Sequence, residues 1–154
     1  MAQQQQQQNS QSSVVDILLT KIMQDKYCNG EKKDLNACVA YYVPTHVDNS
    51  YVDLSIQRRG AKKCEEHSKA LSQCMQHDAL AKQTAIIDAA SKHNKCVDER
   101  NTLVKCQQTA GGNKAACELQ YYSLLECGMI NIITSMRGKQ QQQQGGAVAL
   151  SETN

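Results

Sequence analysis

The sequence predicts an all-α protein of two disulfide-stapled antiparallel helical hairpins, with an N-terminal helix and low-complexity tails. Two observations predict this fold. The eight cysteines form four pairs, each with nine intervening residues, and a leucine lies three residues before the second cysteine of every pair. The pairs are Cys28 and Cys38, Cys64 and Cys74, Cys96 and Cys106, and Cys117 and Cys127, and the leucines are Leu35, Leu71, Leu103 and Leu124.

The spacing within each pair is that of one face of a helix. An α-helix turns about 100° per residue, so the leucine seven residues after the first cysteine returns to nearly the same face. The second cysteine follows three residues later, and the repeat becomes an amphipathic stripe of Cys, Leu and Cys. Two such helices laid antiparallel bring the first cysteine of one opposite the second cysteine of the other.

Antiparallel neighbours therefore predict a disulfide pairing. In the first hairpin Cys28 would bond Cys74 and Cys38 would bond Cys64; in the second, Cys96 would bond Cys127 and Cys106 would bond Cys117. Eight cysteines formally allow 105 connectivities, and sequence alone does not choose among them. The run Gly111-Gly112-Asn113 supports the second hairpin, because it ends one helix and predicts a turn before the next.

Four segments follow from this pattern. Residues 1–11 are a polyglutamine tail expected to be disordered, and residues 12–78 hold the first hairpin with its preceding helix. Residues 79–137 hold the second hairpin with a linker helix, and residues 138–154 are a second low-complexity tail.

Helix boundaries come from capping and breaking residues. Ser13 with Asp16 predicts the start of the first helix, and Asn29-Gly30 predicts a kink or break just after Cys28. Pro44 ends the next helix, and a loop is expected from 43 to 55. A second long helix is expected from about residue 54 until His77-Asp78, and a fourth from about 114 to 136.

Metal and catalytic chemistry are not expected. Zinc knuckles bring ligands two to four residues apart, whereas cysteines ten apart on a helix lie about 15 Å from each other and cannot hold one ion. His67 and His77 each follow a cysteine by three residues, but we interpret both as ordinary helix-surface residues. No catalytic residue, metal ligand or cofactor is predicted, because every cysteine is assigned to a structural pair.

Two groups of apolar residues lie outside the segments that the predicted disulfides connect, and both are predicted to contact a partner. One consists of the tyrosines around the first loop, and the other follows the last cysteine. They are Tyr41, Tyr42 and Tyr51, and Met129, Ile130, Ile132 and Ile133. The basic cluster Arg58-Arg59 with Lys62-Lys63 is interpreted as a solvated helix turn, with an acidic neighbour or RNA as the alternative.

Composition limits the compartment and the class of partner. A net charge of +2 gives no case for nucleic acid or an anionic membrane. Paired cysteines indicate an oxidising compartment, yet no secretory signal, matrix presequence or membrane-spanning run is recognised. This combination predicts the mitochondrial intermembrane space.

The four C-x6-L-x2-C repeats resemble the coiled-coil-helix-coiled-coil-helix (CHCH) family, the twin Cx9C proteins of mitochondria. The segments SSVVDILLTKIMQDKYC, AKKCEEHSKALSQC and CQQTAGGNKAAC further resemble the style of family members that carry two such domains. The resemblance implies two disulfides across each hairpin and transient contact with the oxidative import machinery. It also implies a peripheral position on the inner membrane.

The resemblance implies a non-catalytic accessory subunit of a respiratory complex, and complex I (NADH:ubiquinone oxidoreductase) is the expected assembly. Its partners would be other subunits of that complex. The alternatives are a mitochondrial ribosomal protein of the CHCH type and an assembly factor of cytochrome oxidase. A ribosomal protein would need a basic face for rRNA, and an assembly factor would need exchangeable thiols.

Overall fold

The computed structural model describes residues 2–43 and 54–151, with side chains described from 10 to 43 and from 54 to 142. Every regular element in those ranges is a helix, so the predicted all-α class is confirmed. The chain divides into two compact units: one is Met23–Lys82, and the other combines Met1–Ile22 with Gln83–Asn154. Each unit contains one complete disulfide-bonded hairpin.

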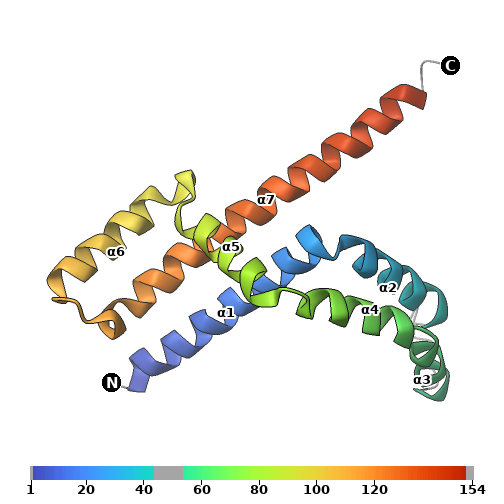
Figure 1. Ribbon diagram of the computed structural model, residues 1–154, viewed down its shortest axis with the longest axis horizontal. Coiled ribbons are helices and arrows are strands. Elements are labelled where there is room, and N and C mark those ends of the chain that lie inside the picture. Colours follow the sequence, from blue (N-terminus) through green and yellow to red (C-terminus); the bar gives the residue numbers. More distant parts are fainter. Residues whose placement is uncertain (1, 44–53, 152–154) are drawn as a thin grey trace. The chain divides into compact units, whose positions relative to one another are not determined.

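The first hairpin consists of three helices. α2 (Asn29–Tyr42) packs against both α3 (Leu54–Lys63) and α4 (Glu65–Gln76), and Figure 1 shows α2 and α4 side by side. The backbone of α3 approaches the end of α2 closely at Gly60, since a Cβ there would overlap the carbonyl oxygen of Tyr42. The predicted helix from 54 to beyond Cys74 is thus two helices, because the backbone of Cys64 leaves the helical region.

The second hairpin pairs α6 (Val97–Thr109) with the first part of α7 (Glu118–Ser151), as Figure 1 shows. Short 3-10 turns, η1 (Asn94–Cys96) and η2 (Lys114–Cys117), lead into these two helices. Gly111 and Gly112 have φ of 60° and 89°, values that glycine adopts without steric cost, and they form the predicted turn. The linker helix α5 (Ala79–Ser91) follows the predicted break at His77-Asp78, where Asp78 also has a positive φ of 49°.

The first cysteine of each pair stands at a helix junction. Cys28, Cys64 and Cys96 have φ/ψ of −126°/31°, −94°/4° and −112°/34°, outside the helical region, and each precedes the first residue of a new helix. Cys117 ends η2 immediately before α7. None of the first three makes a side-chain cap hydrogen bond.

Acidic residues follow each of these junctions. Carboxylates in the first turn of a helix interact favourably with the positive end of its dipole, typically by 0.3–1 kcal/mol. First-turn carboxylates therefore stabilise the starts of these helices, which have no Ser, Thr or Asn side-chain cap. The residues are Glu31 in α2, Glu65 and Glu66 in α4, Asp98 and Glu99 in α6, and Glu118 in α7.

The low-complexity ends differ from the prediction of disorder. α1 runs over Ala2–Tyr27, so it contains the first glutamine run and begins well before Ser13. α7 likewise continues through the second glutamine run to Ser151, beyond the predicted end near 136. Glutamine is a good helix former, and both runs join helices already stabilised by packing, so extension needs no new nucleus.

The unit that contains the second hairpin has a further apolar core. Gln11 of α1 donates to Ser123 of α7 at 3.4 Å, and the backbone of Ala90 in α5 closely approaches Gly128 in α7. Buried residues come from all three helices: Val15 and Ile22, Ile86 and Ala90, and Leu125, Met129 and Ile133. This packing explains why residues up to 22 group with the second hairpin, whereas the sequence assigned them to the first.

Candidate functional site

The most clearly built feature of the chain is its set of four disulfide rungs. The bonds are Cys28–Cys74, Cys38–Cys64, Cys96–Cys127 and Cys106–Cys117, which is the pairing that antiparallel helices predict. Their Cα atoms are 5.8–6.1 Å apart, within the usual range for disulfides. No cysteine of the chain is free. All eight cysteine sulfurs are therefore held in disulfides.

The leucines between the rungs pack as the repeat predicts, but unequally in the two hairpins. Leu103 and Leu124 form one buried cluster with Cys96 and Cys117, and they are 9 % and 2 % exposed. Leu35 and Leu71 in the first hairpin are only half-buried. The first hairpin consequently depends more on its disulfides, since less apolar surface is removed from water.

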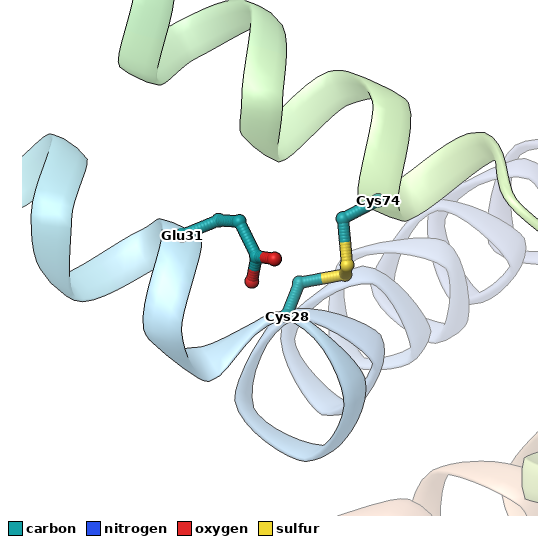
Figure 2. A group of neighbouring side chains, drawn as sticks. All are labelled: Cys28, Glu31 and Cys74. Carbon is teal, nitrogen blue, oxygen red and sulfur yellow. A yellow bond between two sulfur atoms is a disulfide. The ribbon is translucent and has the colours of Figure 1, made fainter.

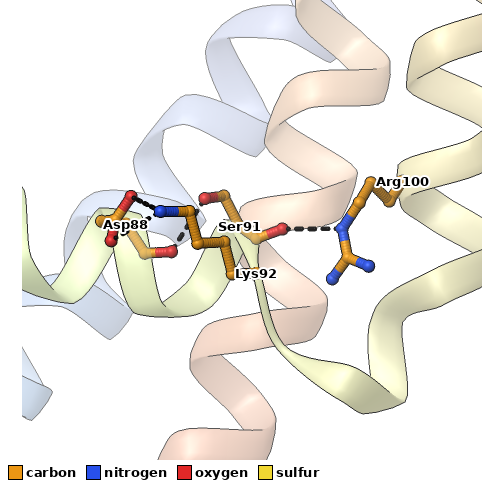
Figure 3. Close-up of polar contacts among 4 residues, drawn as sticks. All are labelled: Asp88, Ser91, Lys92 and Arg100. Carbon is orange, nitrogen blue, oxygen red and sulfur yellow. Dashed lines mark hydrogen bonds and ion pairs between the residues drawn. The ribbon is translucent and has the colours of Figure 1, made fainter.

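One arginine links the second hairpin to the chain segment that precedes it. Arg100 of α6 donates from Nε to the carbonyl of Ser91 at 3.1 Å, as Figure 3 shows, and from its guanidinium to the carbonyl of His93 at 2.7 Å. Lys92 lies at the same helix end and pairs with Asp88 at 3.0 Å. These cations satisfy groups at the C-terminal end of α5, where the helix dipole favours positive charge.

The predicted tyrosine contacts are at the surface where the structure describes them. Tyr41 is 82 % exposed and Tyr42 is 40 % exposed, with their rings edge to face at 4.7 Å. Tyr42 also lines a shallow cleft with Ile56, Arg59, Gly60 and Lys63, and the Lys63 ammonium lies 4.8 Å from the Tyr42 ring centre. Tyr51 lies outside the described residues.

The second predicted contact group requires correction. Met129 is fully buried and Ile133 is 8 % exposed, so the chain itself covers both. Ile132 is half-buried, and only Ile130, at 47 %, is an exposed member of the group. A partner cannot bind the group as a continuous apolar patch on this face.

The histidines and the basic cluster are at the surface. His67 and His77 are exposed, and His77 lies 3.4 Å from the Asp78 carboxylate. The four basic side chains of α3, Arg58, Arg59, Lys62 and Lys63, are likewise exposed. No helix in the described part of the chain is long and apolar enough to cross a membrane.

Two carboxylates beside the disulfides were missed by the sequence reasoning. Glu31 lies against the Cys28–Cys74 bond, as Figure 2 shows, and Glu99 lies against Cys96–Cys127. The available signal was an identical offset, since a glutamate follows the first cysteine of each hairpin by three residues. Each of these groups combines side chains from two segments that the hairpin brings together.

The comparisons with known proteins add no relative. No protein-family model, no curated protein and no solved structure matches the chain.

Proposed function

We propose that this chain is a non-catalytic structural accessory subunit of a mitochondrial respiratory complex. The proposed assembly is complex I, with the chain peripheral on the intermembrane-space side of the inner membrane. The observation that carries the proposal is that all eight cysteines are in disulfides across two helical hairpins. Such a framework suits a structural subunit, because it leaves no thiol for transfer or catalysis.

Rigid hairpins favour assembly for a thermodynamic reason. A subunit that is already ordered loses less conformational entropy when it docks, so more of the contact energy contributes to affinity. Disulfides typically add 2–4 kcal/mol each to stability and so permit a small apolar core. The chain has no Phe or Trp, which makes that contribution important here.

The surface beside the first hairpin loop supplies a candidate contact. The Tyr41 side chain is largely exposed to solvent, and the neighbouring cleft combines the Tyr42 ring and Ile56 with the cations Arg59 and Lys63. An aromatic with adjacent positive charge suits a subunit surface with apolar and acidic side chains, since aromatics and arginine are enriched at interfaces.

The test is co-migration in detergent-solubilised mitochondria. A tagged chain should migrate with the band that stains for NADH dehydrogenase activity in a native gel. Tyr41→Ala should lower its share in that band, whereas the control Leu80→Ala, at a residue 79 % exposed on α5, should not. Circular dichroism of both purified variants should match the wild type, which separates lost docking from lost folding.

Two other results would contradict complex I and favour the alternatives. Migration with a mitochondrial ribosomal particle, lost after ribonuclease treatment, would point to the exposed cations of α3 as an RNA or ribosomal-protein contact. Migration with cytochrome oxidase intermediates, together with exchangeable thiols in the native chain, would favour the assembly-factor alternative.

A further inference from the structure

Each hairpin brings a carboxylate to its outer rung, the disulfide farther from the hairpin's own loop. In the first hairpin the ligand atoms of Cys28, Glu31 and Cys74 all lie within 4.8 Å of one another. Cys96, Glu99 and Cys127 form the same group in the second hairpin. Among the described residues, neither inner rung has a third group of this kind.

Local helix geometry produces this arrangement twice. The first cysteine stands at the N-terminal junction of a helix, and the glutamate lies three residues later, one turn along the same face. Figure 2 shows the Glu31 side chain reaching from the first turn of α2 toward the two sulfurs. The repeated offset in two separate hairpins argues that the placement follows from the backbone.

We propose that, in the reduced chain, each outer rung is a zinc site formed by two cysteine thiolates and one glutamate carboxylate. Zinc takes Cys sulfur at about 2.3 Å and carboxylate oxygen at about 2.0–2.2 Å, usually in a tetrahedron. Three protein ligands leave the fourth position for water. This goes beyond a structural role, because it assigns the thiol form of the chain its own ligand.

The distances suit such a site after small movements. Two sulfurs on a tetrahedral zinc lie about 3.8 Å apart, given the Zn–S length. The outer rungs have Cα separations of 6.0 and 6.1 Å. Once the disulfide is reduced, side-chain rotation between staggered rotamers can bring both sulfurs and the nearby carboxylate onto one ion.

The chemical balance is simple. A dithiol reductant gives two electrons and two protons to each disulfide and is itself oxidised to a disulfide. Zinc then displaces one proton from each of the two cysteine thiols that bind it. Oxidation of the rung removes both thiolates, and the zinc and disulfide forms therefore exclude each other.

The second site has additional support for its sulfurs. The side-chain amide of Asn131 donates toward Cys96 and Cys127, with Nδ2 at 3.7 Å from each sulfur. Hydrogen bonds of this kind orient thiolate ligands, and outer-shell partners typically change metal affinity by 10–100-fold. The residue at the matching position of the first hairpin is Asp78, whose side chain has no amide N–H to donate. The Glu99 site should therefore bind zinc more tightly than the Glu31 site.

The test uses the full chain, reduced with a dithiol and freed of it by anaerobic gel filtration. Titration with Zn²⁺ against a chromophoric chelator should give two ions per chain, and the oxidised chain should bind none. Glu31→Gln and Glu99→Gln should each weaken one site by at least about tenfold, the scale of lost ligand support. The controls Glu65→Gln and Glu118→Gln remove first-turn acids next to inner-rung cysteines and should leave both sites unchanged.

Serine variants keep the test decisive if reduction loosens the helices. A chain with only the four outer cysteines should bind two zinc ions and gain helical circular dichroism on binding, whereas a chain with only the four inner cysteines should do neither. Binding of equal strength in urea, or equal losses in the glutamate variants and their controls, would overturn the proposal.

Discussion

A glycine pair on one helix gives the sharpest test of the packing. A Cβ at Gly128 would overlap the carbonyl oxygen of Ala90 and lie 2.5 Å from the Ala90 carbonyl carbon and Cα, whereas a Cβ at Gly138 meets nothing within 4 Å. Both glycines are in α7, so both should gain about 1 kcal/mol of helix propensity on replacement by alanine. Only Gly128→Ala forces two backbones apart.

The magnitude follows from these two terms. Overpacking costs typically 1–3 kcal/mol, and a backbone neighbour cannot rotate away, so the upper part of that range applies at Gly128. After the propensity gain, Gly128→Ala should lose about 2 kcal/mol, while Gly138→Ala should gain up to about 1 kcal/mol. At about 2–4 °C per kcal/mol for a chain of this length, Gly128→Ala should lower Tm by about 4–8 °C.

The assay is thermal unfolding of the oxidised chain, followed by circular dichroism of the helices. Gly138→Ala controls for the general effect of glycine replacement in α7. A Gly128→Ala protein as stable as Gly138→Ala would mean that α5 does not approach α7 as described, and the second apolar core would need revision.

Other predictions follow from burial and charge. Alkylation of the native chain should add no label, and alkylation after reduction should add eight, as counted by mass spectrometry. Asp25→Asn should cost about 1–2 kcal/mol in chemical unfolding, because its 2.7 Å ion pair with Lys32 is mostly buried, while Asp88→Asn at an exposed pair should change little. Arg100→Gln should cost about 1–2 kcal/mol through two lost charge-assisted hydrogen bonds, read from the same unfolding curves. Ile133→Ser should destabilise the chain by about 3 kcal/mol, whereas Ile130→Ser should stay near the wild type; equal effects would contradict the corrected placement of this group.

The cysteine framework could be predicted because covalent geometry leaves few solutions. Antiparallel helices with cysteines ten residues apart align two rungs at once, and the observed pairs agree. A break just after Cys28 was predicted from Asn29-Gly30, but the residue that leaves the helical region is Cys28 itself, and Asn29 and Gly30 begin α2. The break at His77-Asp78 was predicted correctly, and Asp78 has the left-handed φ of 49° that Asp adopts more readily than most residues.

Features that depend on contacts between residues far apart in the chain could not be predicted from the sequence. Met129 and Ile133 looked unpartnered because no cysteine rung covers them, yet they lie in a unit with buried residues of α1 and α5 such as Ile22 and Ile86. The sequence shows that α1 has an apolar face but not which part of the chain it meets. Glu31 was missed for a similar reason, since its significance appears only when Cys74 is brought beside it.

The outer rungs also determine how the protein would respond to tension. Pulled by its two ends, the oxidised chain transmits force through Cys28–Cys74 and Cys96–Cys127, and the residues enclosed by these bonds, spanning separations of 46 and 31, are bypassed. Only the stretches before Cys28, between Cys74 and Cys96, and after Cys127 can lengthen. A single-molecule extension trace should therefore stop far short of the full contour until a reductant is added.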